Sequence, residues 1–183
     1  MKSIVLGLIL IVLGFAGCSA DRSLVKSDLV IASPTPSPDP KTHRYIDFSV
    51  KGVRLGDTEQ NLIKIFGKPR NRIVSNDGVC GVAPIAKLRY PGVEFWLDRG
   101  TEGTELEWAI LEFTVTSPDV LVEPEIRVGA EAAAVKQILG TAWTEKSDGE
   151  SIFYHYLTKD NDNASLEFKN GKLDRIRVYI NPC

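Results

Sequence analysis

Cysteine, histidine and clustered carboxylates are the side chains of this 183-residue sequence that could act in catalysis. A thiol hydrolase needs a cysteine nucleophile beside a histidine base, and Cys80 with His155 is the pair that the sequence offers. Oxidation of Cys80 to a disulfide would remove that nucleophile. Glu102, Glu105 and Glu107 could form a glycosidase-like carboxylate pair, but an acidic, solvated hairpin loop is the simpler interpretation. We therefore expect no catalytic residues and no enzymatic activity.

Motifs for metals, cofactors and nucleic acids are missing from the sequence. It has no H-E-x-x-H pattern, no calcium loop and neither of the nucleotide-binding glycine motifs. The two histidines, His43 and His155, do not stand at ligand spacing from a cysteine. The formal net charge of −2 leaves no basic surplus to attract nucleic acid. We expect no metal, no cofactor and no nucleic-acid partner.

The first twenty residues have the pattern of an export signal. Lys2 precedes an apolar run from Ile4 to Phe15, which is too short to span a bilayer but typical of a secretory signal. The stretch from Phe15 to Cys18 resembles a bacterial lipobox, in which the cysteine is acylated and becomes the mature N-terminus. This resemblance implies a signal peptide over residues 1–17 and a lipid anchor, with palmitate, at Cys18. A secreted protein with a chance cysteine at this position is the alternative.

Ser19 indicates where the anchored protein would reside. The aspartate associated with inner-membrane retention in enteric bacteria is missing at this position, so in a Gram-negative host we expect the outer membrane, facing the periplasm. Residues 18–44 follow as a Pro- and Ser-rich tether, because the four prolines of ASPTPSPDP favour extended chain.

Cys80 and Cys183 remain once Cys18 is assigned to lipid. An even number of cysteines in an exported chain favours a disulfide, because the compartment beyond the inner membrane is oxidising. We expect a bond between Cys80 and Cys183. Two free, buried thiols are the alternative.

A short pattern occurs twice in the chain, at a spacing of 73 residues. Residues 53–67 read VRLGDTEQNLIKIFG and residues 126–140 read IRVGAEAAAVKQILG. Each copy has a glycine before a helical pattern and a Phe-Gly or Leu-Gly at its end, as expected for a strand, a turn and a helix. In the first copy, Asp57 with Gln60 predicts a capping box at the start of the helix. We therefore expect the residues that the two copies have in common to serve the fold and not a binding site.

Alternating strands follow each predicted helix. They read AKLRY, GVEFWLD and EWAILEFTV after the first, and SIFYHYL, ASLEFK and KLDRIRVYI after the second. Asn170-Gly171 predicts a tight hairpin turn between the last two strands. We expect an α+β protein of two tandem units, each a helix packed on a small antiparallel sheet, over residues 45–118 and 119–183.

This duplicated pattern resembles the tandem-repeat fold of the β-lactamase inhibitor protein family and, more distantly, the single-unit SmpA/OmlA lipoproteins of outer-membrane assembly. The resemblance covers about residues 45–181, nearly the whole mature domain, and implies two helical layers backing one broad concave sheet that binds proteins. The chain departs from the family in having one candidate disulfide instead of one per unit. It also has Thr141-Ala142 where the first copy has Lys68-Pro69. No inhibitory residue and no β-lactamase target is carried over.

Period-two alternation divides the strand residues between two faces. In GVEFWLD it places Trp96 among charges, opposite the apolar side. In EWAILEFTV it places Leu111 and Phe113 on the apolar side, with Trp108 and Ile110 opposite. In SIFYHYL the set with both tyrosines and the set with His155 are each apolar enough to face the core. In the last strand the alternation places Ile176, Val178 and Ile180 inward and Arg175, Arg177 and Tyr179 outward. Aromatic and arginine residues are enriched in interface hot spots, and the candidates for partner binding are Trp96, Trp108, Tyr154, Tyr156, Arg175, Arg177 and Tyr179.

The sequence thus favours a lipid-anchored, monomeric cell-envelope protein that binds another envelope protein through its sheet. An inhibitor, an immunity-like factor or an assembly accessory fits this description. Burial of Trp96 and Trp108 under the helices or the Pro-rich segment is the alternative for these side chains. A lipoprotein that binds a small ligand or a cell-wall fragment is the alternative function, and a hydrolase comes third.

Overall fold

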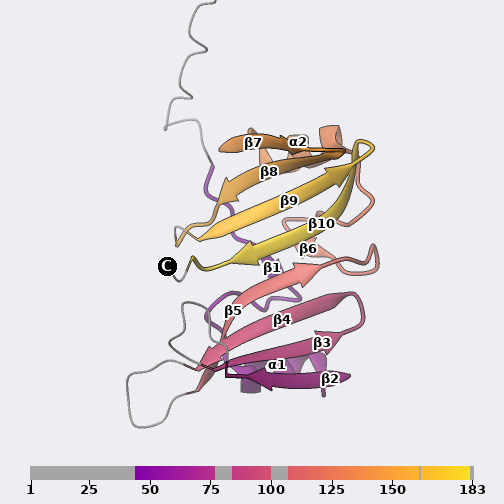
Figure 1. Ribbon diagram of the computed structural model, residues 1–183. Helices are drawn as coiled ribbons and strands as arrows, with labels where there is room; N and C mark the ends of the chain where they lie inside the picture. The colour runs from indigo at the N-terminus through magenta and orange to yellow at the C-terminus, as the bar shows by residue number, and fades with distance from the viewer. Residues whose placement is uncertain (1–43, 77–83, 100–106, 161, 182–183) are drawn as a thin grey trace, which may run out of the picture. The chain divides into compact units, whose positions relative to one another are not determined.

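The chain forms short helices that end at glycines and short strands with alternating apolar residues (Figure 1). The computed structural model describes residues 44–76, 84–99, 107–160 and 162–181, which belong to one compact unit, Pro36–Cys183. Its elements are, in chain order, β1 (Ser49–Val50), α1 (Glu59–Phe66), β2 (Asn71–Ser75), β3 (Ile85–Tyr90), β4 (Val93–Arg99), β5 (Trp108–Val115), β6 (Val122–Glu123), α2 (Ala132–Leu139), β7 (Thr144–Asp148), β8 (Ser151–Leu157), β9 (Asn163–Lys169) and β10 (Lys172–Tyr179).

Eight of these strands form one antiparallel sheet in the order β2-β3-β4-β5-β10-β9-β8-β7. The two halves of the chain meet where β5 pairs with β10, with Val115 opposite Ile176 and Glu112 opposite Tyr179. β1 and β6 form a separate two-stranded sheet. The described chain is therefore mostly antiparallel strand with two helices, as expected for the α+β class.

The predicted hairpin between the last two strands is present. Asn170 and Gly171 have φ values of 51° and 75°, and Lys169 pairs with Lys172 across the turn. Two consecutive residues with positive φ are what a tight hairpin needs, and Asn-Gly adopts this conformation at little cost. The prediction from the Asn-Gly pair is confirmed.

The first helix begins one residue later than its sequence pattern indicates. Thr58 is the N-cap, and its hydroxyl accepts a hydrogen bond from the backbone N–H of Asn61 at 3.2 Å. The carboxylate of Asp57 instead accepts from the backbone N–H of Arg54 at 2.9 Å. The predicted capping box of Asp57 with Gln60 is therefore wrong, because Asp57 closes the preceding turn.

Both helices end at a glycine that a tyrosine of the sheet contacts. Gly67 and Gly140 have φ values of 79° and 83°, which only glycine adopts readily. The Tyr90 hydroxyl donates to the Gly67 carbonyl at 3.1 Å, and the Tyr156 hydroxyl donates to the Gly140 carbonyl at 3.3 Å. Each helix is thus tied at its C-terminal end to the strand beneath it.

The turn before each helix is tied to the sheet in the same way. The backbone N–H of Gly56 donates to the Ile110 carbonyl at 2.8 Å. The N–H of Gly129, at a spacing of 73 residues from Gly56, donates to the Leu173 carbonyl at 2.7 Å. The two glycines of the repeated pattern therefore make equivalent contacts with β5 and β10.

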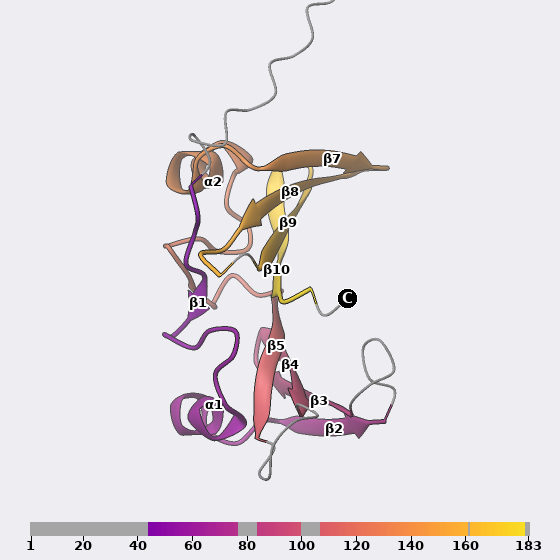
Figure 2. The same cartoon turned by 90° about the vertical axis from the view of Figure 1, so that its left-hand side faces the viewer.

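The core lies between the helices and one face of the eight-stranded sheet. Figure 2 shows α1, α2 and β1 on the same side of this sheet. Leu62 of α1 and Val135 of α2 are fully buried there, as are Phe95 and Phe113 of the sheet, whose rings lie 6.1 Å apart. Burying a side chain of this size contributes about 1.5–3 kcal/mol. Neither helix of the described residues is long and apolar enough to cross a bilayer.

A β-bulge interrupts the alternation along β5. The register with β4 shifts between Trp96 and Leu97, which leaves Leu111 as the extra residue on β5. Before the bulge, Ile110 is fully buried on the helix side and Trp108 packs against the same core. The predicted assignment of Trp108 and Ile110 to the polar face is therefore wrong, because the bulge shifts the side-chain period by one residue.

Candidate functional site

The side of the eight-stranded sheet opposite α1 and α2 carries the candidate site, and we call it the open face. Among the described elements, no helix or strand packs on this side (Figure 2). Strand alternation and burial assign to it the side chains of Lys87, Arg89, Glu94, Trp96, Glu112, Thr114, Glu167, Lys169, Arg175, Arg177 and Tyr179.

Trp96 stands at the centre of a polar group on β3 and β4. Its indole N–H donates to the Glu94 carboxylate at 2.7 Å, and the Lys87 ammonium lies 3.7 Å from the centre of its ring. Arg89, opposite Glu94 on β3, forms an ion pair with the same carboxylate. The indole is thus held by two strands and is partly exposed.

These contacts set the protonation of Glu94. Burial alone would raise the pKa of its carboxyl, but the hydrogen bond from Trp96 and the bond and charge of Arg89 outweigh burial, with a further contribution from Lys87. The net effect lowers the pKa of Glu94. The group is therefore ionised at neutral pH.

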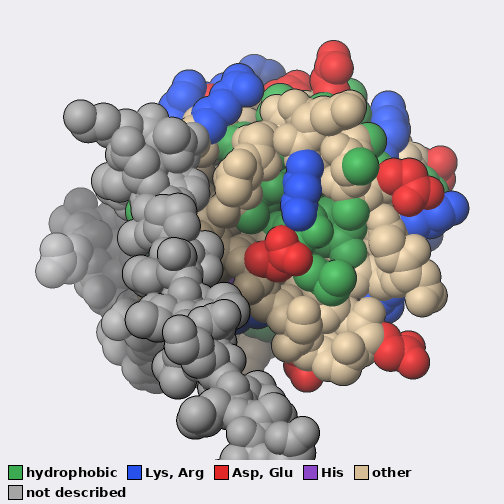
Figure 3. Space-filling view, turned by 90° about the horizontal axis from the view of Figure 1, so that it is seen from above, with side chains coloured by type: hydrophobic (Ala, Val, Ile, Leu, Met, Phe, Trp, Pro, Cys, Tyr) green, Lys and Arg blue, Asp and Glu red, His purple; other side chains and the backbone are tan. Residues whose placement is uncertain are grey.

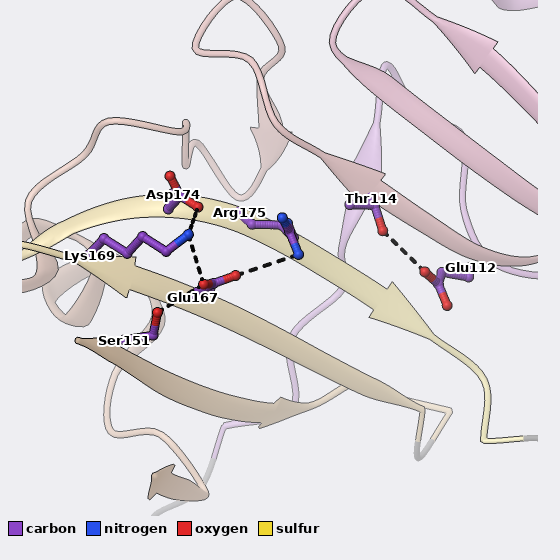
Figure 4. Close-up of polar contacts among 7 residues, drawn as sticks. All are labelled: Glu112, Thr114, Ser151, Glu167, Lys169, Asp174 and Arg175. Atoms are coloured by element: carbon purple, nitrogen blue, oxygen red, sulfur yellow. Dashed lines mark hydrogen bonds and ion pairs between the residues drawn. The ribbon is translucent and has the colours of Figure 1, made fainter. Parts of the chain in front are cut away.

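A second polar group spans the β5–β10 pair, where the two halves of the sheet join. The Arg177 guanidinium donates to the Glu112 carboxylate at 2.7 Å, and the Thr114 hydroxyl donates to the same carboxylate at 3.1 Å (Figure 4). The guanidinium also lies 4.6 Å from the ring centre of Tyr179. The hydrogen bond to Glu112 raises the pKa of Arg177, although burial opposes it.

A third group surrounds Glu167 on β9. Figure 4 shows its carboxylate between Lys169, Arg175 and Ser151. The Lys169 ammonium lies 3.1 Å from one oxygen and the Ser151 hydroxyl donates to it at 3.0 Å, while an Arg175 nitrogen lies 3.6 Å from the other oxygen. Lys169 also pairs with Asp174 at 2.9 Å. Charged side chains from β9 and β10, together with the Ser151 hydroxyl of β8, are therefore joined on the open face.

A shallow hollow lies between the Trp96 group and the β5–β10 pair. It has a volume of about 360 Å³ and is lined by side chains that include Arg89, Glu94, Trp96, Glu112, Thr114 and Arg175. The hollow combines one aromatic wall with charged rims. It is wide enough for a single side chain or a small ligand.

Another hollow, of about 400 Å³, lies between the end of α2 and β7. The Lys136 ammonium lies 3.3 Å from the Glu145 carboxylate and 4.3 Å from the ring centre of Tyr154. The view from above shows apolar side chains gathered around basic and acidic ones on this side (Figure 3). This hollow is separate from the one beside Trp96, because the two have no lining residue in common.

Four of the seven predicted partner-binding residues are on the open face. Trp96 is on β4, and Arg175, Arg177 and Tyr179 are on β10. Both arginines are exposed, and the other two side chains are partly exposed. These placements agree with the predicted alternation of β4 and β10. They leave partner binding itself as a prediction.

The other three predicted residues face the helices, which corrects their assignment. Tyr154 and Tyr156 are 5% and 2% exposed in the core beneath α2. Burial raises the pKa of Tyr156 to about 12. Trp108 packs against the core, and the Arg72 guanidinium covers its ring at 5.3 Å. The alternative of a tryptophan covered on the helix side is correct for Trp108, and the open face of β8 carries His155 in place of the tyrosines.

The other open-face residues named above were not predicted as site residues, namely Lys87, Arg89, Glu94, Glu112, Thr114, Glu167 and Lys169. The alternation of each strand predicts which face these residues occupy. In AKLRY, for example, it places Lys87 and Arg89 on the side opposite Leu88. What the sequence could not supply was the order of the strands. That order brings β3 and β9 to opposite sides of the same central pair.

Cys18, Cys80 and Cys183 lie outside the described residues, as do His43, Glu102 and Glu105. The predicted lipid anchor and disulfide therefore stay predictions. In the described part of the chain, no three His, Cys, Asp or Glu side chains are grouped so as to hold a metal ion. Burial, together with the charge of Lys146, lowers the pKa of His155.

Comparison with known proteins gives distant structural likenesses only. No family model and no curated protein matches the chain. An extracellular protein containing an SCP domain from Bacillus anthracis is 13% identical over 69% of this chain and 44% of that chain, with a TM-score of 0.44. A cysteine-rich secretory protein from Staphylococcus aureus is 11% identical over 77% of this chain and 48% of that chain, with a TM-score of 0.47.

A putative β-lactamase inhibitor protein from Streptococcus mutans is 11% identical over 73% of this chain and 89% of that chain, with a TM-score of 0.26. The chain spans less than half the length of the first two proteins. All three TM-scores are too low to establish a common fold. No property of these proteins is therefore transferred to this chain.

Proposed function

We propose that the protein is a non-catalytic, lipid-anchored component of the bacterial cell envelope that binds another protein through the open face. The observation that carries the proposal is the convergence of Trp96, Arg175, Arg177 and Tyr179 on one face of a continuous sheet on which no described element packs. Tryptophan, tyrosine and arginine are the residue types most enriched among interface hot spots.

The repeated contacts support a tandem-repeat origin for this face. The glycine–sheet and tyrosine–helix hydrogen bonds occur once in each half of the chain, with the two pairs of glycines each at a spacing of 73 residues. We propose that the two halves are duplicated units of the β-lactamase inhibitor protein type. In this proposal, duplication joins two four-stranded halves at β5 and β10 into one continuous sheet, whose open face binds the partner.

Anchoring is proposed from the sequence. Cys18 with its preceding apolar run is the proposed acylation site, and two or more acyl chains would hold the protein stably on a membrane. Replacing Cys18 with serine should abolish fatty-acid labelling and release the protein from the membrane fraction. Unchanged fractionation of the Cys18→Ser variant would contradict the anchor without affecting the proposed binding face.

Site-specific photocrosslinking in intact cells tests the binding face. A benzophenone amino acid at Thr114 is on the open face, whereas the same residue at Lys64 or Gln137 is on the exposed side of a helix. We expect a discrete protein adduct from position 114 only. Trp96→Ala should then weaken that adduct, and circular dichroism of the purified variant should show that it keeps the wild-type fold.

Two results would contradict the proposal. The first is an absence of any protein adduct from position 114, and the second is equal adducts from all three positions. The alternative function, binding of a small ligand or cell-wall fragment, depends on the hollow beside Trp96. A small molecule that co-purifies with the wild type but not with Trp96→Ala, together with no protein adduct, would favour that alternative.

A further inference from the structure

The acidic and basic side chains of the open face lie at different depths. In the Arg89–Glu94 pair the two side chains are 56% and 27% exposed. In the Arg177–Glu112 pair the values are 48% and 11%. The arginines therefore form an outer layer, and each carboxylate lies closer to the sheet beneath its partner.

The pair on β10 and β9 repeats this arrangement. The Arg175 side chain is 49% exposed, whereas that of Glu167, its partner, is 12% exposed. Lys169, the other partner of Glu167, is 45% exposed. Three separate carboxylates on three different strands thus hold basic groups outward. A docking partner would meet the basic groups first.

The same pairing keeps the summed charge of these three polar groups small. The basic members are Lys87, Arg89, Lys169, Arg175 and Arg177, and the acidic members are Glu94, Glu112, Glu167 and Asp174. Beyond the Debye length of about 8 Å in physiological salt, these charges largely cancel. Within contact distance, the exposed guanidinium groups dominate over Glu94, Glu112 and Glu167, which are 27%, 11% and 12% exposed, whereas Asp174, at 41%, is exposed beside Lys169. Such a face suits the binding of a few discrete carboxylates at close range. It suits an extended polyanion less well, because attraction of a polyanion depends on a large net positive charge.

We propose that the partner of the open face presents an acidic protein segment, whose carboxylates bind Arg89 and Arg175 on either side of an apolar side chain seated in the hollow against Trp96. This inference rests on the proposed function and specifies the chemistry of the partner. Arg89, Trp96 and Arg175 all line the same hollow of about 360 Å³, together with Glu94 and Glu112, whose carboxylates are paired with Arg89 and Arg177. One segment can therefore engage both guanidinium groups and the indole at the same time. Arginine suits carboxylate recognition because its planar guanidinium can donate hydrogen bonds to both carboxylate oxygens at once.

Arg89 and Arg175 can be neutralised without orphaning the carboxylates beneath them. Without Arg89, Glu94 keeps the hydrogen bond from the Trp96 indole. Without Arg175, Glu167 keeps Lys169 and Ser151. The variant with Arg89→Gln and Arg175→Gln should therefore retain the wild-type fold, which its circular dichroism and urea midpoint can check.

Panning random short peptides displayed on phage against the full chain tests the inference. We expect enriched peptides to contain an aromatic or aliphatic residue flanked by Asp or Glu. The double variant should bind them about tenfold more weakly, and affinity should fall as sodium chloride is raised. Arg54→Gln is the matched control, because Arg54 is similarly exposed and ion-paired, with Asp47 at 3.2 Å, but lies in the loop between β1 and α1. That variant should bind the peptides like the wild type.

The outcomes separate this inference from the proposed function. The inference of an acidic partner is wrong if the enriched peptides are neutral or basic, or if they bind the double variant as well as they bind the wild type. In that case, a protein adduct from position 114 would still support the proposed function. Binding to vesicles containing phosphatidylglycerol, with no enrichment of acidic peptides, overturns the inference of an acidic partner in favour of a lipid surface. Failure of every crosslink from position 114 contradicts the proposed function itself.

Discussion

Replacing Arg177 with glutamine should lower the free energy of unfolding, because it removes the cation that compensates a covered carboxylate. Glu112 is paired with Arg177 across β5 and β10 at 2.7 Å. After the substitution, the hydrogen bond from Thr114 at 3.1 Å is the described contact that remains to the carboxylate. The Glu112→Gln change removes the charge that needs compensation, so the two substitutions should not be additive.

The expected magnitude follows from how deeply the pair is buried. Exposed ion pairs contribute about 0.2–1 kcal/mol, and breaking a fully buried pair costs about 3–5 kcal/mol. The Glu112 side chain is 11% exposed, but that of Arg177 is 48% exposed, so water still reaches one partner. We expect a cost of about 1–2 kcal/mol for Arg177→Gln, nearer the exposed limit.

Urea unfolding of the wild type, Arg177→Gln, Glu112→Gln and the double variant measures this coupling. The double variant should lie within about 0.5 kcal/mol of wild type, since replacing both partners can be nearly neutral. The reasoning fails if Arg177→Gln alone is as stable as wild type, or if the double variant is destabilised by the sum of the two single changes. If the double variant is stable, it also allows the contribution of Arg177 to partner binding to be measured in a folded protein.

Three further results are expected. Tyr90→Phe and Tyr156→Phe should each cost about 1 kcal/mol in urea unfolding, because each removes a hydroxyl bond to a helix end; no cost would mean that these bonds contribute nothing. Gly92→Ala should cost about 2 kcal/mol or more, since Gly92 has a φ of 75° and an added Cβ would lie 2.4 Å from the Ser117 Cβ; an unchanged Tm would contradict that clash. The lowered pKa of Glu94 contributes stability that is present above its unfolded pKa of 4.5 and is lost as the pH falls through the lower folded value. Glu94→Gln should flatten the pH dependence of unfolding in that acidic range, and an unaltered profile would refute this assignment.

The sequence predicted the faces of β4 and β10 correctly because their alternation is regular over the residues concerned. Val93 and Phe95 are buried while Trp96 is partly exposed, and Ile176 is buried while Arg177 is exposed. A period of two is enough to assign such strands. The glycine ends of both helices were equally clear, because a positive φ leaves few other residue types.

The remaining features depend on contacts that a linear pattern does not contain. The bulge at Leu111 moves Trp108 to the helix side without leaving a recognisable mark in EWAILEFTV. Both faces of β8 are apolar, so only packing under α2 places Tyr154 and Tyr156 in the core. β7 reads TEKSD and all five of its residues are exposed, so this strand has no apolar signal. It forms because it extends an existing sheet edge.

The order of the strands has a consequence for how the chain folds as it is synthesised. β10 is the last strand of the described chain, yet it pairs with β5 in the middle of the sheet. The first half can therefore assemble β2 to β5 while the edge of β5 has no partner, until the polypeptide through Tyr179 has emerged. An unpaired, apolar strand edge is a site of mispairing between copies. Faster completion of the chain should shorten that exposure, and truncation within β10 should open the centre of the sheet and produce aggregation.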